Sequence, residues 1–203
     1  MRNGACVKPP RAPYQSPLRA RLKEQTSVII LEAVAEILRT ADLTAVSIAE
    51  VARVAQLSEQ TIYRHYNGRD ALIRAFIEYH LNLETGGPDL KLPETIAELL
   101  LWQEGRYQDW ENNLRIASEA YLSAIGRELR QPLYEIGFRN ILKMLANEHP
   151  NLSEEPRRRI ATAMLSLMST ENFVFLNRTF GFGAAQASAS IRTSIEAMLN
   201  GAQ

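Results

Sequence analysis

The chain has little of what builds covalent or metal-bound frameworks. Its 203 residues include one cysteine, Cys6, which excludes a disulfide within the chain. No C-x-x-C pair or His-Cys cluster occurs, so neither a metal site nor a cofactor is expected. Cys6 lies in a polar terminal segment, where a solvated thiol is the simplest interpretation.

Long apolar runs and catalytic patterns are missing as well. No run of about 18 apolar residues and no apolar signal core occurs, so we expect no membrane span and a cytoplasmic location. Without a G-x-S-x-G, H-E-x-x-H or phosphate-loop pattern, an enzyme is not expected. The adjacent acids Glu154 and Glu155 stand at an expected helix start, where capping explains them.

Neither sign of charge is in excess over the whole chain. The 23 Lys+Arg and 23 Asp+Glu give a formal net charge of +0, which argues against a protein that coats nucleic acid. Residues 1–80 hold 11 Lys+Arg against 8 Asp+Glu, whereas residues 81–203 hold 12 against 15. The N-terminal part therefore carries the basic excess. A content of 46% hydrophobic residues suits one or two globular domains.

The stretch SIAEVARVAQLSEQTIYRHYNGRDAL, from Ser47 to Leu72, predicts two short helices, a tight turn and the start of a third helix. Ser47 and Glu50 form an S-x-x-E capping box at the first helix. Its apolar face has helical spacing and consists of Ile48, Val51, Ala52 and Ala55.

The second helix is expected from Glu59 to about His65, capped by Ser58. Two short helices joined by so few residues cross steeply, which is typical of a helix-turn-helix. Ile62 and Tyr66 are expected to point inward. The outward side chains are of the kinds that contact bases and phosphates in a DNA major groove: Ser58, Glu59, Gln60, Thr61, Tyr63, Arg64 and His65. Asn67 is the expected cap of the following helix.

The run IAEVARVAQLSEQTIYRHYNGRDALI resembles the DNA-binding domain of the TetR (tetracycline repressor) family of bacterial transcription regulators. The shared pattern is an Ala-containing apolar helix, a turn, a Ser-led helix with T-[LI]-Y, and then H-[FY]-x-x-[KR]-x-x-L. Gln56 stands where the family usually has Gly, and a left-handed backbone there would cost about 1 kcal/mol. Arg69 replaces the usual Lys and offers a planar fork.

The resemblance implies a role for each outward residue. Ser47, Tyr63, His65 and Arg69 occupy positions that meet phosphates. Ser58, Glu59, Gln60, Thr61 and Arg64 occupy positions that face base edges or their margins. Gln60 can pair with adenine and Glu59 can accept from cytosine N4. An alternative for Glu59 is a favourable charge at the helix N-terminus.

The expected fold is all-α, with three parts. Residues 1–20, rich in Pro and basic groups, are expected to be a disordered tail, either solvated or reaching a minor groove. Residues 21–68 form a three-helix helix-turn-helix domain, with its first helix from Leu22 to about Thr40. Residues 69–203 form a helical ligand-binding and dimerisation domain, entered by a long fourth helix that runs to about Leu83, before Gly86-Gly87-Pro88.

The second domain is expected to hold helices over 94–108, 112–129, 132–147, 153–178 and 184–199. Aromatic and polar residues scattered among apolar ones predict a ligand pocket, although aromatic residues at helical spacing also fit a core. The pocket candidates are Trp102, Tyr107, Trp110, Tyr121, Phe138, Glu171, Asn172, Phe173 and Arg178.

Apolar stripes on the last two helices fit either an intramolecular core or a dimer interface, and the resemblance implies a four-helix bundle between two copies. The candidate interface residues are Ile160, Met164, Leu167, Met168, Phe175, Ile191, Ile195, Met198 and Leu199.

The expected function is ligand-responsive regulation of transcription. A homodimer would bind a pseudo-palindromic double-stranded DNA operator and be released by a small molecule. Repression is favoured over activation, because occluding a promoter needs no further partner surface. The alternative is a DNA-binding regulator whose second domain is an interaction or dimerisation module without a ligand.

Overall fold

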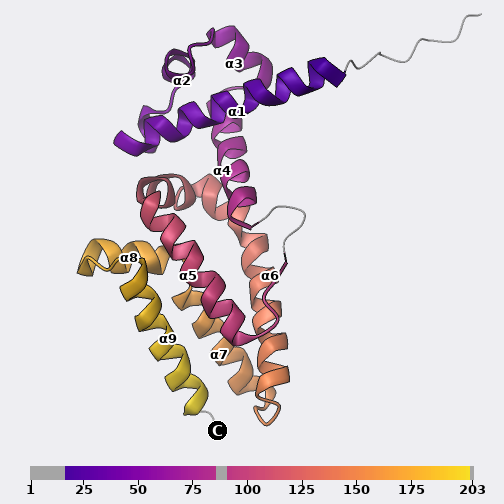
Figure 1. The fold of residues 1–203 in the computed structure, drawn as a ribbon, viewed down its shortest axis with the longest axis vertical. Helices are drawn as coiled ribbons and strands as arrows, with labels where there is room; N and C mark the ends of the chain where they lie inside the picture. The colour runs from indigo at the N-terminus through magenta and orange to yellow at the C-terminus, as the bar shows by residue number, and fades with distance from the viewer. Residues whose placement is uncertain (1–16, 86–90, 202–203) are drawn as a thin grey trace, which may run out of the picture.

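A computed structural model describes residues 17–85 and 91–201, and within these ranges every regular element is helical. The predicted all-α class is confirmed. Figure 1 shows a small group of helices at one end, joined by one helix to a larger helical group. None of the helices in the described ranges combines the length and apolarity needed to cross a membrane.

The N-terminal group contains the predicted helix-turn-helix. Its elements are α1 (Pro17–Thr40), the short turn η1 (Leu43–Ala45), α2 (Ile48–Ala55), α3 (Glu59–His65) and α4 (Arg69–Thr85). Helix α1 packs on α2 and α4, and α2 packs on α3.

Helix α1 begins at Pro17, earlier than the predicted start at Leu22, so residues 17–20 are not part of a tail. Proline suits a first helical position, because the N–H that it lacks would have no partner there. The rest of the predicted tail, Cys6 included, lies outside the described residues, as does the Gly86-Gly87-Pro88 segment.

One hydrophobic core fixes the position of α3. Its only fully buried side chain, Ile62, belongs to the same core as side chains of α1, α2 and α4. The fully buried members in this part are Ile30, Val34, Leu38, Val46, Val51, Ile62, Leu72, Ile73, Phe76 and Ile77. Because truncating such a residue to alanine costs about 2–5 kcal/mol, α3 is held rigidly on its scaffold.

The larger group begins with α5 (Ile96–Asn112), the π-helical segment η3 (Ile116–Tyr121) and α6 (Ala124–Glu148). It continues with α7 (Glu154–Leu167), α8 (Thr170–Phe180) and α9 (Ala184–Asn200). Helix α5 packs on α9, and α6 packs on α7. In Figure 1, α8 and α9 lie along the outer edge of this group.

The predicted division into helices 112–129 and 132–147 is wrong. Helix α6 starts after Ser123, whose Oγ accepts from the Gly126 N–H at 3.0 Å, and it runs through Pro132. An internal proline costs about 3 kcal/mol; packing of α6 against α7 outweighs that cost.

The predicted helix 153–178 is in fact two helices. Ser169 caps α8 by accepting from the Asn172 N–H at 3.2 Å. A serine that bonds the backbone in this way offers the chain an alternative to continuing the helix.

Candidate nucleic-acid interface and ligand cavity

Ser47 starts α2 as predicted, with its Oγ accepting from the Glu50 N–H at 3.1 Å. The second half of the predicted capping box is not formed. The Glu50 carboxylate accepts instead from Arg53, at 2.9 Å from Nε and 2.6 Å from one Nη. These bonds lower the pKa of Glu50, so both charges are already paired on the α2 surface.

The turn between α2 and α3 has a left-handed residue at Gln56, with φ 54° and ψ 40°. The Leu57 N–H then donates to the Ala52 carbonyl at 2.9 Å. A small residue at Ala52, 4% exposed, lets the two helices approach closely. A left-handed conformation, which glycine adopts most readily, is therefore held here by a glutamine.

Both ends of α3 are held in place. Ser58 Oγ accepts from the Thr61 N–H at 3.1 Å, which satisfies one unpaired donor of the first turn. At the other end the Tyr66 hydroxyl lies 2.5 Å from Ser27 Oγ on α1. Gly68, with φ +93°, precedes Arg69 and its carbonyl accepts from the Leu72 N–H at 3.1 Å, so Gly68 rather than Asn67 stands before α4.

The predicted DNA-contacting residues share one end of the molecule, opposite the C-terminus in Figure 1. Tyr63 is 55% exposed. The other exposed residues of the set are Ser47, Ser58, Glu59, Gln60 and Arg64, and those of intermediate exposure are Thr61, His65 and Arg69. The face offers hydroxyl, amide, carboxylate and guanidinium groups to a partner.

Arg69 differs from the other predicted DNA-contacting residues, because its guanidinium already has hydrogen-bond partners within the protein. Nε donates to the Val46 carbonyl and one Nη to the Leu43 carbonyl, each at 2.7 Å. The other Nη lies 3.6 Å from an Asp70 carboxylate oxygen. Arg69 thus ties the start of α4 to the loop before α2.

His65 is held in its neutral form at pH 7. Partial burial lowers its pKa from 6.5, and the charges of Arg64 and Lys23 lower it further. A neutral imidazole donates only one hydrogen bond.

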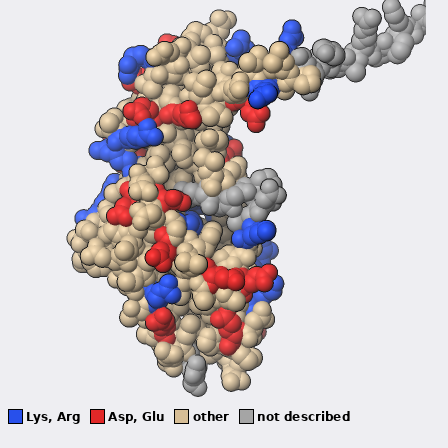
Figure 2. All heavy atoms as spheres, viewed as in Figure 1, with Lys and Arg blue, Asp and Glu red and all other residues tan. Residues whose placement is uncertain are grey.

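The described N-terminal part has no net positive charge that would attract DNA. Residues 17–80 carry 8 Lys+Arg and 8 Asp+Glu, so the basic excess of residues 1–80 rests on Arg2, Lys8 and Arg11 alone. Figure 2 shows acidic and basic side chains interspersed over the face in view. Any binding of DNA by this part must therefore depend more on specific contacts than on net charge.

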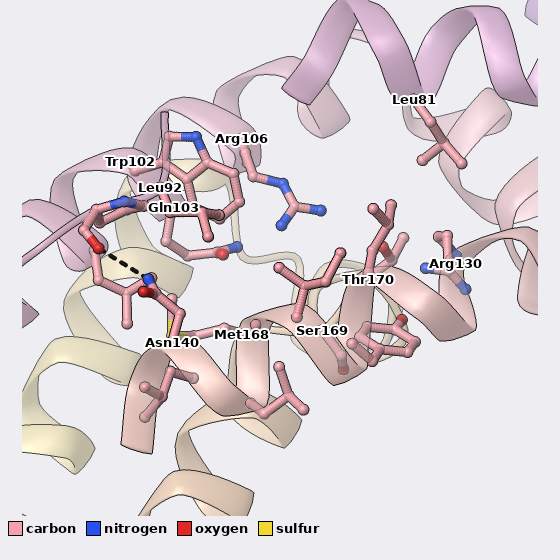
Figure 3. Close-up of a pocket in the computed structure, with 18 residues that line it drawn as sticks. Leu81, Leu92, Trp102, Gln103, Arg106, Arg130, Asn140, Met168, Ser169 and Thr170 are labelled. Carbon is pink, nitrogen blue, oxygen red and sulfur yellow. Dashed lines mark hydrogen bonds between the residues drawn. The ribbon is translucent and has the colours of Figure 1, made fainter. Parts of the chain in front are cut away.

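The larger group encloses a cavity of about 90 Å³ between α5, α6 and the start of α8, with Leu81 of α4 at its edge (Figure 3). Most of its walls are apolar. Seven polar residues also line it: Gln103, Arg106, Arg130, Tyr134, Asn140, Ser169 and Thr170.

Trp102 alone of the predicted pocket residues lines this cavity. Tyr107 stacks on Phe173 with ring centroids 4.8 Å apart, and Trp110 lies beside both, so these three aromatic residues are core. Burial raises the pKa of the Tyr107 hydroxyl, which donates to the Leu167 carbonyl at 3.0 Å.

The remaining predicted pocket residues have other surroundings. Tyr121 is buried in η3, and the Arg158 guanidinium lies 5.6 Å from the Phe138 ring. Asn172 donates to the Leu167 carbonyl at 2.7 Å, and Arg178 lies 3.8 Å from Glu119. Glu171 stands behind the cavity wall, where it accepts from Arg130 at 2.8 Å.

The polar lining of the cavity was missed from the sequence, although a signal was present. Leu99, Gln103, Arg106 and Trp110 follow helical spacing, so a glutamine and an arginine interrupt an apolar face of α5. A polar residue on such a face needs a partner and is a better pocket marker than an aromatic one.

Most of the predicted dimer residues are buried within a single chain. Phe175 is 52% exposed. Leu167 and Met198 are half-buried. The others are at most 9% exposed and have little surface left for a partner: Ile160, Met164, Met168, Ile191, Ile195 and Leu199.

A capped helix-turn-helix on an all-α chain is an arrangement found in DNA-binding proteins. Residues 30–76 match the family described as bacterial regulatory proteins, tetR family. The matched residues run from α1 into α4, so the likeness to this family covers the helix-turn-helix part of the chain.

A relative in sequence is the HTH-type transcriptional regulator AlkX of Mycobacterium tuberculosis. The two are 35% identical over 66 residues, which is 32% of this chain and 29% of the relative. The chain thus matches less than a third of that relative's length.

The fold is shared with two solved structures at 16% identity. One is NalD, the secondary repressor of the MexAB-OprM multidrug efflux pump in Pseudomonas aeruginosa, with a TM-score of 0.63 over 88% of this chain and 97% of NalD. The other is a putative transcriptional regulator from Pseudomonas aeruginosa PAO1, with a TM-score of 0.66 over 88% and 90%.

Proposed function

We propose that this chain is a repressor that binds a pseudo-palindromic operator as a homodimer and releases it when a small molecule occupies the second domain. The observation that carries the proposal is the position of α3. Ser58 caps this helix, and the hydrogen bond between Tyr66 and Ser27 holds its end on α1. Gln60 and Tyr63 are exposed on its outer face. A rigid, polar, outward helix is what direct readout of a major groove requires. NalD, which shares the fold, is named a repressor.

Within this interface the roles divide by chemistry. Gln60 is the candidate for bidentate pairing with adenine, and Glu59 for accepting from cytosine N4. Ser58, Thr61 and Arg64 lie at the margins of the same base edges. Ser47, Tyr63 and His65 are assigned to phosphates, which fix register without reading sequence. Arg69 is assigned to positioning, since its guanidinium already binds two carbonyls.

The dimer contact is assigned to the exposed face of α8 and α9. Phe175 and Phe180 are 52% and 59% exposed and pack edge to face, with ring centroids 5.7 Å apart. Exposed aromatic side chains grouped in this way mark interaction surfaces. Both helices lie at the outer edge of the molecule, where a second copy has access (Figure 1).

Signal transfer is assigned to α4, which belongs to both parts because it packs on α1 and on α6. Leu81 of α4 lines the cavity, and Arg74 donates to Glu128 of α6 at 2.9 Å. The domain boundary at residues 68 and 69 is therefore a shared helix rather than a linker. A ligand can shift α4 only if it binds one of two arrangements of the helices more tightly than the other.

Selection of binding sites from a random DNA pool tests the proposal. A two-fold dimer should return an inverted repeat whose half-site centres lie about 34–36 Å apart, or somewhat more. A Gln60→Ala chain selected in parallel should return the same repeat with one position degenerate. Recovery of a site without symmetry, or of no site, would contradict the dimeric repressor.

A further inference from the structure

The charge of the N-terminal part is unevenly distributed, and its positive share lies on the first turns of α1. Residues 17–25 hold Arg19, Arg21 and Lys23 against Glu24, a net charge of +2. Residues 26–80 hold 5 Lys+Arg against 7 Asp+Glu, a net charge of −2. The neutral total over residues 17–80 therefore combines a basic helical segment with an acidic remainder.

Most cations of that acidic remainder are already engaged within the protein. Four of the five hold a carboxylate or a backbone carbonyl: Arg39, Arg53, Arg69 and Arg74. Only Arg64 remains in residues 26–80 without such a contact. Within the described parts of the chain, Arg19, Arg21 and Lys23 make no ion pair either. The first turns of α1 thus supply most of the unpaired positive charge at this end of the molecule.

Residues 17–25, which we call the α1 arm, project from the packed part of the molecule. All nine residues are exposed, and Figure 1 shows this end of α1 extending past α3. Nine residues of α-helix span roughly 13 Å. The arm continues the same helix whose later turns are buried in the core, from Ile30 to Leu38. It is therefore a helical extension with a fixed direction.

One side of the α1 arm continues the side of α1 that meets α3. Arg19, Lys23 and Ser27 follow each other at intervals of four, which places neighbouring members on one side of a helix. Ser27 Oγ lies 2.5 Å from the Tyr66 hydroxyl at the end of α3. The charge of Lys23 is also felt at His65, whose pKa it helps to lower. Arg19 and Lys23 are thus placed beside the end of α3.

We propose that the α1 arm binds the DNA backbone, with Arg19 and Lys23 contacting phosphates next to those at the end of α3. Lys and Arg side chains neutralise phosphates and release condensed counterions, which adds affinity without reading bases. The arm supplies the electrostatic attraction that the rest of the DNA-binding part lacks. This inference rests on the proposed function, in which the α3 face binds DNA.

A salt series of fluorescence anisotropy measurements on the full chain tests the proposal, with the selected duplex and a scrambled one. Arg19→Gln and Lys23→Gln should each reduce the salt slope of binding by about two in a dimer, one for each arm. Each should weaken binding several-fold at physiological salt. The two duplexes should be affected equally, because a phosphate contact carries no sequence information.

Arg21→Gln is the matched control. Arg21 lies on the same exposed arm but only two residues from Arg19 and from Lys23, so it points to another side of the helix. The variant loses the same charge and gains the same side chain, and it should keep the salt slope of the parent chain. Thermal unfolding should be unchanged in all three variants, since the replaced side chains are exposed.

A slope reduced as much by Arg21→Gln as by the other two variants would overturn the proposal, because the arm would then act only through net charge. An unchanged slope in the double variant of Arg19 and Lys23 would overturn it as well. The proposed function fails in a different way. If the parent chain binds neither duplex, DNA binding itself is contradicted; if it binds but the double variant keeps its slope, only the role of the arm is.

Discussion

Arg69 makes structural contacts at a position where the resemblance in sequence implies a contact to phosphate. The sequence places a cation at the head of α4, where a phosphate contact is implied. In the folded chain the guanidinium binds the Leu43 and Val46 carbonyls at 2.7 Å. A planar fork can reach two carbonyls at once, which a lysine ammonium does less well.

Replacing Arg69 with alanine should therefore lower stability before it lowers DNA affinity. Loss of two charge-assisted hydrogen bonds from a partly exposed side chain should cost about 1–3 kcal/mol of unfolding free energy. Urea unfolding of the purified chain measures this loss.

Arg64→Ala is the matched control, because Arg64 is exposed on α3. It should leave unfolding unchanged and weaken DNA binding. If Arg69→Ala unfolds like the parent chain and only flattens the salt dependence of DNA binding, Arg69 is a phosphate contact instead.

At the residue scale, the sequence predicts the local geometry of the helix-turn-helix better than the lining of the cavity. Ser58 and Ile62 take the roles that helical spacing and capping assign them, because both depend on neighbours a few residues away. Gln103 and Arg130 come to line one cavity only after α5 and α6 pack together. No local pattern shows that they share it.

At the scale of elements, the bounds of the short capped helices α2 and α3 are predicted well, whereas those of α6, α7 and α8 are not. The bounds of α2 and α3 follow from Ser47 and Ser58, whose side chains bond the backbone. Helix α6 crosses a proline, and α7 ends at Leu167 inside an apolar run, just before Ser169 caps α8. In those places tertiary packing, which the sequence pattern does not display, decides where a helix continues.

Gln56 offers a test of the turn. A non-glycine residue at φ 54° is strained, so Gln56→Gly should raise the unfolding free energy by about 1 kcal/mol or somewhat less. Chemical denaturation of the full chain gives the value. Gln56→Ala keeps the strained backbone and should show no gain. A loss of stability in Gln56→Gly would mean that the glutamine side chain makes a favourable contact there.

At the scale of the whole molecule, α4 joins the two parts, and His80 lies on it where they meet. The His80 ring packs on Phe76 with centroids 4.5 Å apart and faces Asp109, Trp110 and Ile116. Burial lowers the pKa of His80 from 6.5, and the charge of Arg39 lowers it further.

Acid should therefore destabilise the folded chain. Between the lowered folded pKa of His80 and the unfolded value of 6.5, the unfolded chain binds more protons. Stability is fully present above pH 6.5 and is lost as pH falls through that window; His65, also lowered, acts in the same direction. Melting temperatures between pH 7.5 and pH 5 should fall less in His80→Gln than in the parent chain.

His149→Gln, at the end of α6, is the control for that pH series. It should reproduce the parent profile. If His80→Gln and His149→Gln have the same acid sensitivity as the parent, the environment of His80 is not what makes the fold acid-sensitive.

The central claim is that α3 reads DNA sequence, and fluorescence anisotropy tests it most directly. The full chain should bind the duplex recovered by selection about a thousandfold or more tightly than a scrambled duplex at physiological salt. In Gln60→Ala, discrimination at one base position should fall by about 1–3 kcal/mol while the other positions keep theirs. Equal affinity for the selected and scrambled duplexes would contradict the account.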